Sequence, residues 1–247
     1  GTDGSREILS GAMLADPTES PYDENGNLRI SISPAEGGTG MFPQVNWIRA
    51  MTERKDNYQI LTLLANAFVD LDIWGGIKYR FQAGTDMEWR KRRRWTPSNA
   101  AGSWISPPPG KASANYDNAN YYTWNIENML TFDRTFGNHT VGALVGYSAQ
   151  KYRREFADIS GSEFPDDEIE GITTALTTRQ GNTGMTEWTI ASWLARVDYS
   201  FKDRYLLQAN IRRDGSSRFG AGHKWASFPS VSAGWIASEE SFMESAG

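Results

Sequence analysis

Residues 77–89 read "IKYRFQAGTDMEW", and the alternation in this stretch decides how the rest of the chain is interpreted. The odd-numbered positions from Ile77 to Trp89 are mostly apolar, whereas the even-numbered positions carry lysine, arginine, glutamine, glycine and two acidic residues. Successive side chains of a β-strand point to opposite faces of a sheet. The stretch therefore predicts a strand with one apolar face and one polar face.

The same period-two pattern recurs along the chain and predicts about seven strands. Most of them run for about ten to fifteen residues, whereas strands of globular proteins usually have about five or six. The predicted strands cover residues 58–71, 77–89, 121–134, 139–150, 187–201, 204–213 and 229–237.

The connections between these strands alternate between short and long. Tight turns are predicted at residues 72–76, 135–138 and 202–204, and long loops at 90–120, 152–186 and 214–226. Short turns at one end of the strands and long loops at the other are typical of outer-membrane β-barrels, whose closure satisfies every backbone group without water. The predicted fold class is all-β, with antiparallel strands forming part of a large transmembrane barrel. Residues 58–247 would supply the wall, and 1–57 an extracellular loop region.

The composition limits the function classes. The net charge of −5 gives no basic field that would attract nucleic acid, and the absence of cysteine excludes disulfides and zinc–thiolate sites. No apolar run is long enough for a spanning helix. The first residues show no signal-peptide pattern, so we expect an interior piece of a longer polypeptide. A soluble β-sandwich, such as a carbohydrate-binding module, is the alternative, because its strands also alternate.

Residues 205–243 carry a recognisable motif series. The sequence "RDGSSRFG" (213–220) is followed by "FPSVSAGW" (228–235) and "SEESF" (238–242). This series closely resembles the signature of SusC/RagA-type TonB-dependent outer-membrane receptors, and residues 187–207 resemble the hairpin that precedes it. The matched motif residues are Arg213, Asp214, Gly215, Ser216, Ser217, Arg218, Phe219 and Gly220.

The resemblance implies a barrel of 22 strands in the cell outer membrane of a Gram-negative bacterium, with an N-terminal plug domain that TonB displaces. It implies import of glycans or peptides together with a SusD-like surface lipoprotein, without catalysis and without a cofactor. The plug and the TonB box are not found in these residues, so the chain is expected to supply wall and loops only.

Candidate substrate contacts fall into two groups. Aromatic rings in the predicted loops offer apolar faces with polar edges, which suit sugar rings. Polar residues on the inner strand face are expected to contact either cargo or the plug. The candidates are Trp104, Tyr116, Tyr121, Arg80, Asp198, Gln208, Asn210 and Arg212.

The run "EWRKRRRW" (88–95) places five cations between two tryptophans. Nucleic-acid binding is one interpretation. The favoured one is a strand leaving the outer leaflet, with Trp89 and Trp95 at the interface and Arg92, Arg93 and Arg94 meeting lipopolysaccharide phosphates.

The residue patterns do not favour catalysis or metal binding. Asp214, Ser217 and His223 show no framework that would activate a nucleophile. Glu127 and Asp133 share a polar strand face, as a glycosidase pair would, but ordinary inner-face positions also explain them. The acidic stretch 164–170 lacks calcium-ligand spacing. We therefore predict no catalytic residues and no metal site.

Overall fold

The structure is a computed structural model that describes residues 9, 12–13, 19–32, 44–102 and 108–243. The chain divides into two compact units. Unit 1 comprises residues 1–61, 89–119 and 155–184, and unit 2 comprises residues 62–88, 120–154 and 185–247. Within the described ranges, no helix combines the length and the apolar character that crossing a membrane requires.

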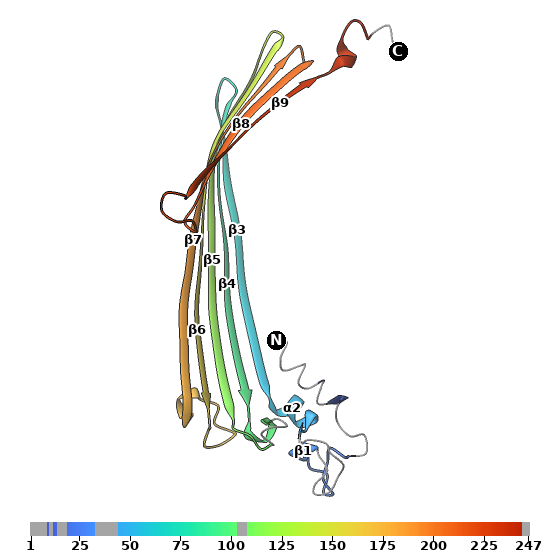
Figure 1. The fold of residues 1–247 in the computed structure, drawn as a ribbon, viewed down its shortest axis with the longest axis vertical. Coiled ribbons are helices and arrows are strands. Elements are labelled where there is room, and N and C mark those ends of the chain that lie inside the picture. The colour runs from blue at the N-terminus through green and yellow to red at the C-terminus, as the bar shows by residue number, and fades with distance from the viewer. Residues whose placement is uncertain (1–8, 10–11, 14–18, 33–43, 103–107, 244–247) are drawn as a thin grey trace. The chain divides into compact units, whose positions relative to one another are not determined.

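Seven strands form one sheet in which each strand pairs with its neighbours in the sequence (Figure 1). The order runs from β3 to β9, which are the two edges, and β8 pairs antiparallel with both β7 and β9. The predicted all-β class and the predicted number of strands are therefore confirmed. The strands are β3 (Lys55–Trp74), β4 (Ile77–Thr96), β5 (Ser113–Phe136), β6 (His139–Ser162), β7 (Thr177–Phe201), β8 (Tyr205–Ser216) and β9 (Trp225–Trp235).

The strands extend further than their apolar alternation predicts, so the three predicted long loops are shorter than expected. β4 continues to Thr96 and β5 begins at Ser113, which leaves a connection of 97–112 in place of 90–120. Likewise β6 and β7 leave 163–176, and β8 and β9 leave 217–224. Charged and polar residues occupy much of the added strand segments, so the hydrophobic alternation weakens although the strands continue.

The tight turns are confirmed where they were predicted. Trp74 and Ile77 are joined by Gly75 and Gly76, whose φ angles of 63° and 92° are those of a two-residue hairpin turn. A Cβ on Gly76 would lie 2.3 Å from the backbone oxygen of Asp133, so only glycine fits there. Lys202 and Asp203 take positive φ angles in the turn between β7 and β8.

In unit 2 the apolar face of the sheet stays uncovered. Leu63, Val69 and Ile73 alternate along β3 and all are exposed, as are large apolar side chains on β5 to β9. The apolar side chains of β4 on this face are partly exposed. A sandwich would bury this face under a second sheet, but the described residues form only one other sheet, the two-stranded pair β1 (Ser31–Ile32) and β2 (Gln44–Val45). The soluble-sandwich alternative is therefore wrong for the described part of the chain. The other exposed outward residues include Trp124, Leu130, Val145, Trp193, Val197, Leu207, Ile211 and Val231.

The described residues within 1–57 include regular secondary structure. Besides β1 and β2, they contain the helix α2 (Trp47–Glu53). Asn46 caps this helix by accepting a hydrogen bond from the Ile48 amide at 3.1 Å, and its own amide donates to the carbonyls of Pro21 and Arg29 at 2.8 and 2.9 Å. Its side chain is fully buried, so one amide fixes the helix start to the preceding segment.

A small core lies in unit 1. Trp95 packs with Ala112 and Ala114, and its ring meets Phe164 edge-on with centroids 4.7 Å apart. Lys111 and the Thr177 hydroxyl bind the Glu163 carboxylate beside this core and hold the pKa of that carboxyl below its usual value. The connections 97–112 and 163–176 are thus tied to the strand ends.

Candidate functional site

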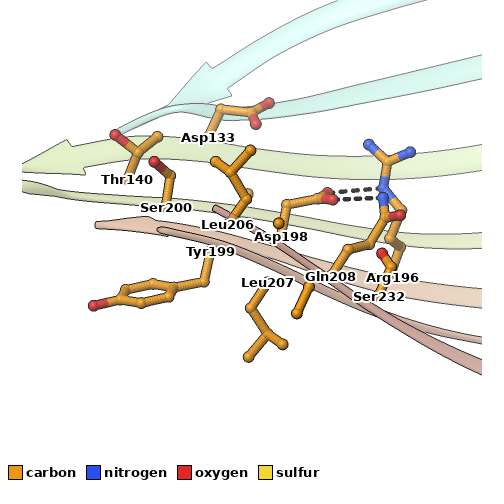
Figure 2. Close-up of a pocket in the computed structure, with 13 residues that line it drawn as sticks. Asp133, Thr140, Arg196, Asp198, Tyr199, Ser200, Leu206, Leu207, Gln208 and Ser232 are labelled. Carbon is orange, nitrogen blue, oxygen red and sulfur yellow. Dashed lines mark hydrogen bonds and ion pairs between the residues drawn. The ribbon is translucent and has the colours of Figure 1, made fainter. Parts of the chain in front are cut away.

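A depression of about 560 Å³ lies on the sheet in unit 2. Figure 2 shows its polar wall, in which the carboxylate of Asp198 faces both Arg196 of the same strand, β7, and Gln208 of β8. The residues that line it are Asp133, Thr140, Gly142, Arg196, Asp198, Tyr199, Ser200, Leu206, Leu207, Gln208, Ser232, Ala233 and Gly234.

Asp198 organises this wall. One carboxylate oxygen accepts a hydrogen bond from Arg196 Nε at 2.8 Å and the other accepts from Gln208 Nε2 at 2.7 Å. The register explains the second contact, because Asp198 pairs with Gln208 and Gln208 pairs with Ser232 on the next strand. Directly opposed residues share one face, so polar groups from three strands meet here.

Gly142 provides the hollow. A Cβ at this position would lie 3.0 Å from Oδ1 of Asp133 and 3.5 Å from Cβ of Asp198. Any larger residue would fill the space between these two acidic side chains. Because Arg196 supplies the one cation among the lining residues against two carboxylates, the depression favours hydrogen-bond donors or a cationic group.

The structure brings some predicted contact residues together and separates others. Asp198 and Gln208 touch, as described above, and Asn210 lies opposite Arg196 in the register. Arg212 is held by Asp214 at 2.7 Å. Arg80, by contrast, is on β4 and binds Asp70 of β3 at 2.6 Å, with β5 and β6 between it and β7.

Asp133, Thr140 and Ser232 of the same wall were not among the predicted contacts. They alternate with apolar residues on their own strands, but the alternation assigns residues only to the polar face and does not single out those that line a cavity. Their meeting at one cavity follows from the pairing register, which the alternation alone does not specify.

The "RDGSSRFG" motif builds a strand end. The amide of Ser217 donates to the Thr189 carbonyl at 2.9 Å, and the Ser217 hydroxyl accepts from the Thr189 amide at 2.8 Å. The Ser216 amide donates to Lys224, and Arg218 lies over the Trp188 ring at 5.0 Å. The two serines therefore join the end of β8 to its neighbours on both sides.

The indole ring of Trp225 leaves no room for a side chain at Gly215 of this motif. Gly215 pairs with Trp225, and a Cβ at 215 would lie 2.7 Å from three atoms of the indole. Arg213 lies over the same indole at 5.4 Å from its centroid. The Trp225 indole therefore packs over Gly215 and against the guanidinium of Arg213.

The hydroxyl of Ser217 already binds the Thr189 amide, and Asp214 binds Arg212. In the part of the chain that the structure describes, no three histidine, aspartate or glutamate side chains gather as metal ligands would.

The predicted lipid-contacting cations do not form one patch. Arg92 binds Asp56 through two hydrogen bonds of 2.8 and 2.5 Å, and Arg94 binds Asn115 and Asp117 at 2.6 and 2.9 Å. Arg93, on the opposite side of the strand, lies over the ring of Tyr116. The alternation separates three arginines that are consecutive in the sequence.

Trp95 is a correction to the predicted interface pair. It is only 4% exposed because Phe164 and two alanines cover it, so it has almost no surface to offer lipid. Trp89 is partly exposed.

The predicted loop aromatics also need correction. Tyr116 and Tyr121 lie inside β5, and the Tyr116 hydroxyl donates to the Glu170 carbonyl at 3.0 Å. Tyr121 lies under the guanidinium of Arg154. Trp104 lies outside the described residues.

Comparisons with known proteins give a consistent result. TonB-dependent receptor P39 of Formosa agariphila is 31% identical over 202 residues, which cover 81% of this chain and 19% of the relative. TonB-dependent receptor P3 of the same bacterium is 28% identical over 99% of this chain and 24% of its own length. TonB-dependent receptor SusC of Bacteroides thetaiotaomicron is 30% identical over 51% of this chain and 13% of its own length. No family model matches the chain.

Solved structures share the fold. The structure of the RagAB peptide transporter superposes with a TM-score of 0.72 at 21% identity, covering 86% of this chain and 23% of that one. The chain thus spans less than a quarter of the length of the relatives described here.

Proposed function

Because this chain is a segment of a SusC/RagA-type TonB-dependent receptor, we propose that it forms part of the wall of an outer-membrane importer. The observation that carries the proposal is the uncovered apolar face of the sheet in unit 2, which has exposed large apolar side chains on β3 and on β5 to β9. Exposed apolar surface on this scale is unfavourable in water but is required where a barrel faces lipid.

The strand lengths are consistent with this proposal. A tilted strand needs about 9–11 residues to cross the hydrocarbon core. β4 has 20 residues and β6 has 24, so about half of each strand lies beyond the bilayer. The strand segments of unit 1, which are rich in charged and polar residues, are the part that we assign to the extracellular side.

The proposed cargo path runs along the inner face. Asp198, Gln208 and their neighbours are placed to hydrogen-bond the plug domain of the intact receptor or the cargo that passes it. A SusD-like lipoprotein would close the barrel from outside and hold glycan or peptide cargo, and TonB would displace the plug. Transport of this kind breaks no chemical bond in the cargo, so we propose a transporter and no enzyme.

The membrane position is tested by placing an arginine on either face of β6. Val145 is exposed on the apolar face, and Ser148 lines a small cavity on the polar face. In the intact receptor, Val145→Arg should reduce the heat-modifiable, folded fraction in the outer membrane, because arginine near the bilayer midplane costs about 2–4 kcal/mol. Ser148→Arg is the matched control and should leave that fraction near the wild-type level. Equal folding of the two variants would contradict the proposal.

Transport itself is tested in cells that lack the intact receptor. Uptake of labelled oligosaccharides and oligopeptides should disappear with the receptor gene and return with it, and should also require the co-expressed lipoprotein and TonB. Uptake that is unchanged by the deletion for every compound tested would contradict the importer proposal.

A further inference from the structure

Unit 1 contains a second polar depression, of about 350 Å³, on the sheet. Three adjacent strands contribute two polar residues each: Arg94 and Thr96 from β4, Ser113 and Asn115 from β5, and Ser160 and Ser162 from β6. Positions two apart on a strand share a face, so the six side chains form one surface.

Four hydroxyl groups on this surface are open for a ligand. Within the described part of the chain, the side-chain oxygens of Thr96, Ser113, Ser160 and Ser162 have no hydrogen-bond partner. All four residues are partly buried. A hydroxyl both donates and accepts, so the group matches a ligand that also presents many hydroxyls.

The charge on the surface is balanced. The Arg94 guanidinium donates to Asp117 at 2.9 Å and to Asn115 at 2.6 Å, so a carboxylate partner is already in place. An incoming anion would compete with Asp117, and an incoming cation would compete with Arg94. A neutral ligand requires no such exchange.

Packing on the opposite face of the same strands supports this surface. Trp95 and Ala114, which alternate with the polar residues, belong to the buried core with Phe164 and Ile172. A Cβ on Gly161, between the two serines, would lie 2.8 Å from Cβ of Ala175. The segment 163–176 therefore backs the strands directly, and a site supported in this way keeps its geometry.

We propose that this surface, which we call the hydroxyl shelf (Arg94, Thr96, Ser113, Asn115, Ser160 and Ser162), binds a neutral sugar unit of the cargo. The inference rests on the proposed importer function and assigns glycan as the substrate class. Recognition takes place through hydrogen bonds to the ring hydroxyls of the sugar.

The test uses the intact receptor with its lipoprotein partner, purified in detergent. Isothermal titration calorimetry is run with a panel of neutral oligosaccharides and with a panel of oligopeptides. The variant Ser160→Ala/Ser162→Ala removes two hydroxyls without adding volume and should weaken binding of the preferred oligosaccharide by about tenfold. Thr173→Ala removes an exposed hydroxyl of the same unit that does not line the depression, and should leave the affinity within about twofold.

The outcomes separate this inference from the importer proposal. Oligosaccharide binding that is weakened in the double variant, with an unchanged heat-modifiable band as proof of folding, supports the shelf. Equal affinity of the double variant and the wild type overturns it. Binding and uptake of peptides alone also overturn it, while the importer function stands. If neither class is taken up by cells, the importer proposal fails as well.

Discussion

Replacing Trp95 by alanine should loosen one part of the receptor and leave the barrel intact. Trp95 is 4% exposed and meets Phe164 edge-on at 4.7 Å, with Ala112, Ala114 and Ile172 around it. Removing a buried tryptophan costs about 3–5 kcal/mol, including the aromatic contact. The neighbouring alanines are too small to fill the space, so little of this loss is recovered.

The loss should appear as local opening of the connection 163–176, whose Phe164 and Ile172 pack on the ring. At about 1.4 kcal/mol per factor of ten, the opening equilibrium should rise by roughly a hundredfold to a few thousandfold. Hydrogen exchange of peptides covering 163–176 in the intact receptor measures this change.

Leu176→Ala is the matched control, because Leu176 is 68% exposed at the end of the same connection. Its effect on exchange should stay within about twofold. If Trp95→Ala also exchanged within twofold of the wild type, the small core would not hold the connection and the reasoning would be refuted.

Three further predictions follow from the geometry. Gly215→Val should destabilise the β8–β9 pair by about 1–3 kcal/mol, because the valine side chain clashes with Trp225. The midpoint temperature of heat modifiability should fall in this variant and recover in Gly215→Val/Trp225→Ala. A midpoint that stays low in the double variant would contradict the prediction. Asn46→Ala should expose the start of α2 to protease, because each buried group left unpaired costs about 1–3 kcal/mol, whereas Asn25→Ala, at an exposed position, should not. The Tyr205 hydroxyl and then the Trp235 indole hold the pKa of Glu240 below its ordinary 4.5, so its contribution to stability is present above pH 4.5 and is lost as the pH falls through the lower folded value. Exchange at 236–243 should therefore rise with acid in the wild type and depend less on pH in Glu240→Gln.

The strand pattern of unit 2 could be predicted from the sequence because lipid imposes a period of two. Ile77, Tyr79 and Phe81 alternate with polar residues, and the tight turn at Gly75 and Gly76 follows from glycine's access to positive φ. The outer halves of the strands could not be predicted in the same way. Around Arg92 and Arg94 both faces are polar, so ion pairs with Asp56 and Asp117 replace hydrophobic alternation.

The sites were less predictable than the fold. The alternation places Asp198 on the polar face, but its meeting with Asp133 and Ser232 depends on the register of several strands. The burial of Trp95 depends on Phe164, which is about seventy residues later in the sequence. A hydrophobic pattern within one strand cannot predict a contact between residues so far apart in the sequence. The "RDGSSRFG" motif is evident from its resemblance to known receptors, but the need for Gly215 follows from its contact with the Trp225 indole on the next strand.

The two outermost strands have a consequence for how such a molecule is made. β3 and β9 each pair on one side only, and every residue along both is exposed. Such edges readily recruit foreign strands, so released alone into water these seven strands would be expected to aggregate. During biogenesis they need a chaperone or an insertion machine to shield both edge strands until the remaining strands pair with them and the barrel closes.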